Sequence, residues 1–264
     1  MTTIRHAAVA GSFYPARPDE LRALVDRLLD AAPHECDDTP PVALIAPHAG
    51  YVYSGPVAAT AYARLLPWRH SITRVVVIGP AHRVPVHGLA LSSAEAFATP
   101  LGLVHVDHLA NGLLARQPGV HVDDRAHEQE HSVEVHLPFL QRVLGSNWSL
   151  VPVVAGAASV TEVADALDTV WAADGTLVVI SSDLSHFHDA HTARRLDAAT
   201  AADIVAGRWE HLAGEQACGA VPVRGALELA RRHDETVRLL DLRNSGDTAG
   251  PDSRVVGYGS FVVG

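Results

Sequence analysis

The chain has 264 residues, 48% of them hydrophobic, and a formal net charge of −10, which suits one enzyme-sized domain with a substantial buried core. The acidic balance excludes the basic surface that nucleic-acid binding requires, and no apolar run reaches membrane-spanning length. All 20 basic residues are arginine, which excludes P-loop phosphate binding and Schiff-base catalysis because both need lysine.

Helical and extended patterns alternate along the chain. It begins with an amphipathic helix over 18–29, where apolar residues recur at helical spacing. Continuous apolar runs at 42–46, 75–79, 149–154 and 177–180 indicate buried parallel strands. The other expected elements are helices over 56–66, 132–144, 160–171 and within 191–232, and strands at 88–92, 103–106, 237–242 and 255–262, the first two forming an antiparallel extension or hairpin. No linker interrupts this alternation, so a single α/β domain over 1–264 with a central, mostly parallel sheet is predicted.

Three of these parallel strands each lead to a histidine. His48 follows the first run, His82 the second and His186 the run at 177–180. Because ligands bind beyond the carboxyl ends of such strands, the three imidazoles are expected at one site. A single strand-end histidine is better explained by hydrogen bonds to backbone. Two such histidines together, His48 and His82, favour a shared polar site, and imidazole is the commonest metal ligand.

Nearby polar residues offer further roles. Asp183 is a candidate to orient an imidazole or accept a proton, and alternatively a helix cap. Asp247 lies in a glycine-containing turn and is expected to supply the third metal ligand, completing the two-histidine, one-carboxylate set typical of non-haem Fe(II). The alternative is an ordinary turn residue. Tyr51 and Tyr53 are expected either to line the pocket or simply to cap the sheet.

Residues 127–131 match the His-Glu-x-x-His pattern of zinc proteases. The residues before this match indicate a loop, so His127 is expected at or before the helix start. The mechanism needs both histidines on one helical face, so a zinc hydrolase ranks below the other hypotheses. Glu130, His131 and Glu134 share a helical face that either surrounds the site or is solvated.

The two cysteines, Cys36 and Cys218, are far apart in the sequence and form no Cys-x-x-Cys pair. They support neither a disulfide framework nor a thiolate metal cluster, and a reducing cytoplasm is the expected location. Cys218 is interpreted as a small buried side chain near the pocket rather than a nucleophile.

Several motifs together resemble one known family. They are Ala-Gly-Ser-Phe-Tyr-Pro at 10–15, Ala-Pro-His-Ala-Gly-Tyr at 46–51, Tyr-Ser-Gly at 53–55, Gly-Pro-Ala-His at 79–82, Glu-His-Ser-Val-Glu-Val-His-Leu-Pro at 130–138, Ser-Ser-Asp-Leu-Ser-His at 181–186 and Ala-Cys-Gly at 217–219. The chain is similar in these segments to the Memo-like family, whose prokaryotic members are called AmmeMemoRadiSam system protein B. That family resembles in turn the class III extradiol (LigB-type) dioxygenases, which cleave catechol rings with non-haem iron.

The resemblance implies a three-layer α/β sandwich of LigB type, a metal site at His48 and His82, and His186 as the acid/base residue. Animal members carry a cysteine as third ligand, and an ungapped match places Thr248 opposite it, next to Asp247. Fe(II) is the cofactor implied, with Zn or Cu as alternatives, and the substrate is a small molecule of aromatic type. The family name also implies a radical-SAM or AMMECR-type protein partner.

The leading hypothesis is therefore an Fe(II)-dependent oxidoreductase of extradiol dioxygenase type. His48, His82 and Asp247 would hold iron, while His186 and Asp183 would handle protons. The first alternative is a non-catalytic metal- or partner-binding module on the same fold. The second is the zinc hydrolase.

Overall fold

Four parallel strands form the centre of the molecule. The structure is a computed structural model that describes residues 3–33, 39–171 and 173–264. The four strands lie in the order β2 (Ala43–Ala46), β9 (Thr176–Ser181), β3 (Arg74–Pro80) and β8 (Ser149–Ala155). Every residue of β2 and β9 is buried, because helices cover both faces of the sheet. The predicted apolar runs are therefore confirmed as central strands. Cys36 lies outside the described residues.

Shorter or antiparallel strands extend this centre on both sides. Beyond β2 lies β12 (Val255–Val263), which is antiparallel to it and also pairs with β11 (Val237–Asn244) and β10 (His186–His188). Beyond β8 lie the antiparallel β4 (Leu89–Leu91) and then β7 (Val120–Val122). The sheet is thus parallel at its centre and mixed at its edges.

The strands expected at 88–92 and 103–106 form, as β4 and β6 (Gly102–His105), but they lie in different sheets and do not pair with each other, so the hairpin of the separate small sheet is not the expected one. In the small sheet β5 (Ala96–Thr99) and β6 are antiparallel, and β1 (Ile4–Arg5) pairs with β5. The sequence pattern indicated β6 but neither β5 nor β1. Such short strands have too few residues for a clear alternation of apolar and polar side chains.

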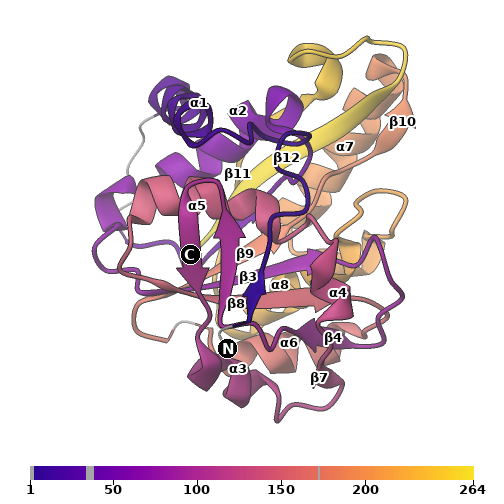
Figure 1. The fold of residues 1–264 in the computed structure, drawn as a ribbon. Helices are drawn as coiled ribbons and strands as arrows, with labels where there is room; N and C mark the ends of the chain where they lie inside the picture. The colour runs from indigo at the N-terminus through magenta and orange to yellow at the C-terminus, as the bar shows by residue number, and fades with distance from the viewer. Residues whose placement is uncertain (1–2, 34–38, 172) are drawn as a thin grey trace.

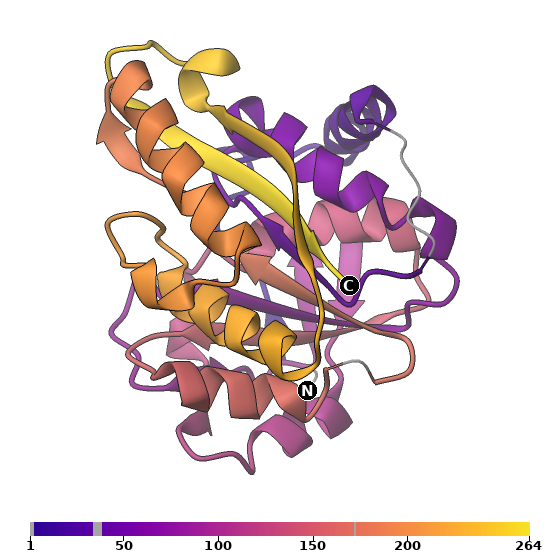
Figure 2. The same ribbon diagram turned by 180° about the vertical axis from the view of Figure 1, so that it is seen from behind.

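Helices cover the two faces of the large sheet. On one face lie α1 (Pro18–Ala31), α2 (Tyr51–Ala63) and α5 (Leu137–Leu144) (Figure 1). On the other lie α6 (Val160–Asp168), α7 (Ala190–Val205) and α8 (Ala220–Arg232) (Figure 2). The remaining elements are α3 (His108–Leu114), α4 (Arg125–Glu128) and the one-turn 3-10 helices η1 (Leu66–Trp68), η2 (Glu134–His136), η3 (Trp209–His211) and η4 (Ser245–Asp247).

Alternate residues of the central strands enter two different cores. In β3, Val75 and Val77 pack with the core under α1, α2 and α5, whereas Val76 and Ile78 pack with the core under α6 and α8. This alternation follows from the two-residue repeat of a strand. The resulting three-layer sandwich confirms the expected α/β fold class.

The helix boundaries differ from expectation near the site. The predicted helix at 56–66 begins earlier, at Tyr51, so Pro56 lies inside it rather than at its start. The predicted helix at 132–144 is shorter, and α5 begins at Leu137 after a single 3-10 turn. Residues 130–133 therefore form irregular backbone, which lets them turn their side chains toward the sheet edge.

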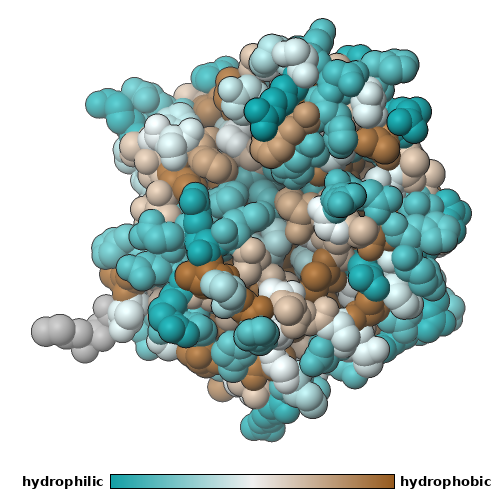
Figure 3. Space-filling view, turned by 90° about the vertical axis from the view of Figure 1, so that its right-hand side faces the viewer, coloured by the Kyte–Doolittle hydropathy of each residue, from teal (hydrophilic) through white to brown (hydrophobic). Residues whose placement is uncertain are grey.

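Among the described helices, none is long and apolar enough to cross a membrane. Figure 3 shows the face on the side of α4 and β10, where hydrophilic residues dominate and apolar residues lie between them in small patches. This agrees with the charged composition of the chain.

Candidate metal centre

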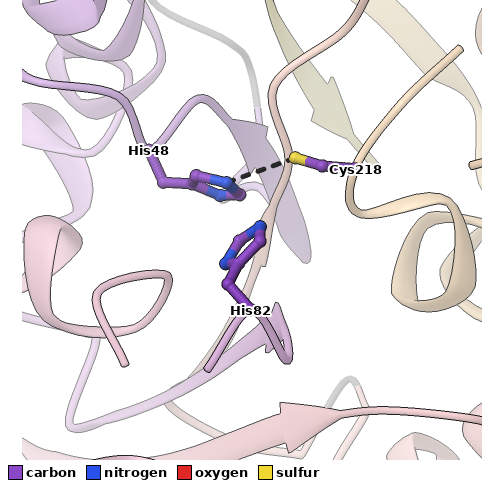
Figure 4. A group of neighbouring side chains, drawn as sticks. All are labelled: His48, His82 and Cys218. Atoms are coloured by element: carbon purple, nitrogen blue, oxygen red, sulfur yellow. Dashed lines mark hydrogen bonds between the residues drawn. The ribbon is translucent and has the colours of Figure 1, made fainter. Parts of the chain in front are cut away.

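Three potential metal ligands meet at the carboxyl edge of the parallel strands. His48 and His82 each lie two residues beyond the ends of β2 and β3, and Cys218 lies just before α8. One ligand atom of each residue lies within 4.8 Å of the other two. Figure 4 shows both rings and the thiol around a common space, with Cys218 Sγ 3.2 Å from His48 Nε2.

Hydrogen bonds determine which nitrogen of His48 faces this space. Its Nδ1 lies 2.6 Å from the Ser181 hydroxyl, which donates its own proton to the carbonyl of Ser132 at 2.6 Å. The hydroxyl must then accept from Nδ1–H, which leaves Nε2 with a free lone pair toward Cys218. Burial, followed by repulsion from neighbouring imidazoles, lowers the pKa of His48 well below its usual value. His48 is thus a neutral, oriented ligand.

Glu130 orients the ring of His82, as Ser181 orients the ring of His48. Its carboxylate accepts from His82 Nδ1 at 3.0 Å and from the backbone N–H groups of His82, His131 and Ser132 at 2.6, 2.9 and 3.0 Å. Burial alone would raise the pKa of Glu130, but these hydrogen bonds lower it to about 2. An ionised carboxylate behind a histidine fixes the ring and strengthens it as a metal ligand.

His131 lies beside the two histidine ligands. Its ring stacks on His82 with centroids 4.8 Å apart and meets His48 edge-on at 5.5 Å. Ligand atoms of His82, Glu130 and His131 also lie within 4.8 Å of one another. Burial lowers the pKa of His131 to about 4, so the ring is neutral. The structure therefore brings Glu130 and His131 to the site.

Cys218 reaches the site because α8 starts unusually close to the end of β9. A Cβ atom on the next residue, Gly219, would lie 2.4 Å from the Ser181 carbonyl oxygen, so only glycine allows this approach. The Cys218 sulfur accepts from the N–H of Asp183 at 3.3 Å. Burial raises the pKa of this thiol to about 12, an effect that a bound cation would reverse. The sulfur thus lies where it could bind a metal together with His48 and His82.

The structure places Asp247 in a turn, apart from the group formed by His48, His82 and Cys218. The Asp247 carboxylate accepts from Arg194 at 2.7 Å and from the backbone N–H of Asn244 at 2.8 Å, closing the η4 turn. The hydroxyl of Thr248 donates to the Ser245 carbonyl in the same turn. Within the described residues, neither side chain joins a potential metal-ligand group. This is the ordinary turn that was the alternative interpretation, and the group of potential ligands contains Cys218 where Asp247 or Thr248 was expected.

Asp183 lies next to His48, and His186 lies near His82. Asp183 is buried and accepts from the backbone N–H of His48 at 2.8 Å, so it holds the ligand's main chain rather than its ring. Burial raises the pKa of Asp183 to about 7, against the effect of that hydrogen bond. The His186 ring is half-buried, and its pKa is lowered by burial and by the neighbouring His82. Of the two, His186 has the more accessible position.

The remaining pocket candidates lie further out. The hydroxyl of Tyr51 donates to the Val135 carbonyl at 2.5 Å inside the core, whereas Tyr53 is exposed. Glu134 is fully buried and binds the N-terminal segment, through the side chains of Arg5 and Tyr14. The solvated face considered for Glu134 is therefore wrong.

The zinc-protease pattern does not assemble a metal site in this structure. His127 lies inside α4 rather than before a helix, and its Nε2 lies 3.0 Å from the Ala90 carbonyl. Its ring is buried against the edge of Phe97. His127 is in neither ligand group, while His131 joins His82 instead.

A family model described as Memo-like protein matches residues 5–262. The chain belongs to the Memo-like family. Similar proteins include MEMO1 family proteins of Aquifex aeolicus, 35% identical and covering 97% of both chains, and of Methanosarcina barkeri, 35% identical over 98% of this chain and 100% of the relative. A third, from Methanopyrus kandleri, is 34% identical and covers 98% of both chains.

In this Memo-like protein, two serines have a role that the sequence did not reveal. Ser181 and Ser132 connect His48 to the backbone of the 130–133 segment. The only available signal was that Ser181 directly follows a predicted strand.

Replacing Ser181 by alanine removes the acceptor for His48 Nδ1 and frees the ring to turn. We expect the affinity for a divalent metal to fall by about 10–100-fold, the usual effect of losing such a supporting partner. Titration under anaerobic conditions with a competing chelator measures it. Ser185→Ala is the matched control, because Ser185 is buried nearby and its hydroxyl forms no hydrogen bond to His48 or His82. Equal affinities in the two variants would contradict the role of Ser181.

Proposed function

We propose that this Memo-like protein holds a redox-active transition metal, with Fe(II) as first candidate, and acts as an oxidoreductase on a small molecule. The observation that carries the proposal is the convergence of His48 Nε2, His82 and Cys218 Sγ on one space. Both rings are held from behind by acceptors, which leaves a lone pair of each directed forward.

The donor set fits a transition metal. Two imidazoles and a thiolate suit Fe, Cu or Zn, whereas Mg²⁺ and Ca²⁺ prefer oxygen ligands. Three protein ligands also leave coordination positions for a substrate. When bound, a redox-active ion would supply the electron-transfer chemistry that amino-acid side chains lack.

The protein residues around the ligands divide the remaining work. Glu130 and Ser181 keep the two rings oriented, and Asp183 holds the backbone of His48. His186 is half-buried, and the nearby His82 helps to lower its pKa. We therefore assign to His186 the exchange of protons with the substrate. General acid–base catalysis of this kind needs only a correctly placed imidazole.

A second candidate function is metal binding without catalysis. It is favoured by the thiol of Cys218, which stands where an oxygen ligand was expected and which suits softer ions such as Cu(I) or Zn(II). The protein would then bind such an ion or present it to a partner.

Metal analysis after anaerobic purification, followed by oxygen-consumption assays with a panel of catechols, distinguishes the two. We expect about one metal ion per chain, and oxygen uptake with the iron-loaded but not with the zinc-loaded protein. Full iron occupancy without oxygen uptake would reject the oxidoreductase and leave the binding function. Absence of metal at any loading would reject both.

A further inference from the structure

A second feature shares Cys218 with the metal centre. It is a cavity of about 310 Å³ whose walls are Pro80, Ala81 and residues 84–86 after β3, residues 155–157 after β8, and Cys218 and Val221 at the start of α8. It lies at the carboxyl ends of two parallel strands, where α/β proteins bind their ligands.

The side chains of the walls are apolar apart from the thiol of Cys218, and backbone groups supply the polar part of the surface. Of the described residues that line the cavity, none carries a charged side chain, and Cys218 is the one with a reactive group. Part of the backbone around the cavity is already hydrogen-bonded within the protein. Ala81 N–H donates to Ala155 O at 2.9 Å, and Ala157 N–H donates to Val86 O at 2.8 Å. A charged ligand group in this space would find no countercharge among these lining residues.

The walls are also rigid. A Cβ atom on Gly156 would lie 2.0 Å from the carbonyl oxygen of Val86, so the two segments touch along their backbones. Gly88 N–H donates to Ala157 O at 2.9 Å, and Gly156 N–H donates to Gly88 O at 3.0 Å. A preformed cavity of this kind binds a ligand without first having to order its own loops.

We infer that the organic ligand of this protein is uncharged, and that it places an apolar body in this cavity while its opposite end reaches the metal centre past Cys218. A cavity of about 150 Å³ accommodates benzene, so 310 Å³ has room for an aromatic ring with substituents or a branched aliphatic group. The cavity selects the substrate, and the metal centre carries out the reaction. The part of this inference that places the opposite end of the ligand at the metal centre rests on the proposed function.

Benzyl alcohol and benzoate form the probe pair, since they are similar in size and differ in charge. We expect calorimetric titration of the metal-free and the zinc-loaded protein to show saturable binding of benzyl alcohol, and binding of benzoate at least about tenfold weaker. Ala157→Trp, at an exposed position of the cavity rim, should weaken the binding of benzyl alcohol by at least about tenfold by filling the space.

Ala199→Trp is the matched control, because Ala199 is an exposed alanine on α7 and not one of the cavity-lining residues. It should bind benzyl alcohol within about twofold of the parent. Equal binding of the two probes, unchanged binding in Ala157→Trp, or no binding of benzyl alcohol would each overturn the inference. The metal content of the parent protein and of every variant is measured separately. A parent protein that binds no metal would contradict the proposed function, whereas one that binds metal but not benzyl alcohol would contradict the inference about the cavity.

Discussion

Replacing Cys218 by serine is expected to weaken metal binding by more than about 100-fold, because it removes a direct ligand and not only a supporting partner. The serine hydroxyl keeps nearly the same size, but it is a poor donor for the ions that a thiolate favours. The fold should survive, since the hydrogen bond from Cys218 N–H to the Asp183 carbonyl is unaffected. Anaerobic titration with Fe(II), Cu(I) and Zn(II) in competition with a chelator measures the change.

Asp247→Asn is the decisive control for this experiment. The substitution keeps the shape of the side chain and removes the charge that pairs with Arg194, a partly exposed pair whose contribution to stability is small. Metal affinity should stay within about twofold of the parent, as for any residue distant from the ligands. If Asp247→Asn lost metal as Cys218→Ser does, the assignment of the third ligand would be wrong.

Arg5→Met is expected to lower the free energy of unfolding by about 3–5 kcal/mol, because it leaves the Glu134 carboxylate buried without its countercharge. The two side chains are 5% and 0% exposed. Arg5 also donates to the carbonyls of His127, at 2.9 Å, and Glu130, so it holds the segment that carries the partner of His82. Denaturant titration gives the loss of stability, and metal titration should show a weaker site as well.

Two further variants test whether the unpaired buried charge causes the loss of stability in Arg5→Met. Arg142→Met breaks a partly exposed ion pair with Asp26 and should cost at most about 1 kcal/mol. The double variant Arg5→Met with Glu134→Gln should recover part of the stability, since it removes the unpaired charge and keeps an acceptor for Tyr14. A single Arg5→Met variant no less stable than Arg142→Met would show that the buried pair does not hold the N-terminal segment.

The sequence was sufficient for the sheet and for half of the site. Buried parallel strands read as continuous apolar runs, so β2, β3, β8 and β9 were predictable. His48 and His82 followed from them, since a strand end fixes where the next side chains lie.

The third ligand was not predictable by the same reasoning. Cys218 lies 170 residues from His48 and precedes a helix rather than following a strand. Its approach depends on the contact of Gly219 with the end of β9, a tertiary contact that leaves no periodic pattern. The Arg5 and Glu134 pair spans 129 residues and was missed for the same reason. Asp247 was chosen because its turn follows a strand, whereas Cys218 precedes a helix.

During translation, the strand that carries His48 leaves the ribosome long before either of its neighbours. β2 ends at Ala46, whereas its partners β9 and β12 begin at Thr176 and Val255. Until both have been synthesised, β2 lacks its native neighbours, and exposed strand edges tend to pair with other chains. The nascent chain therefore depends on late segments to protect an early one, and the group of His48, His82 and Cys218 cannot assemble until residue 218 has been synthesised.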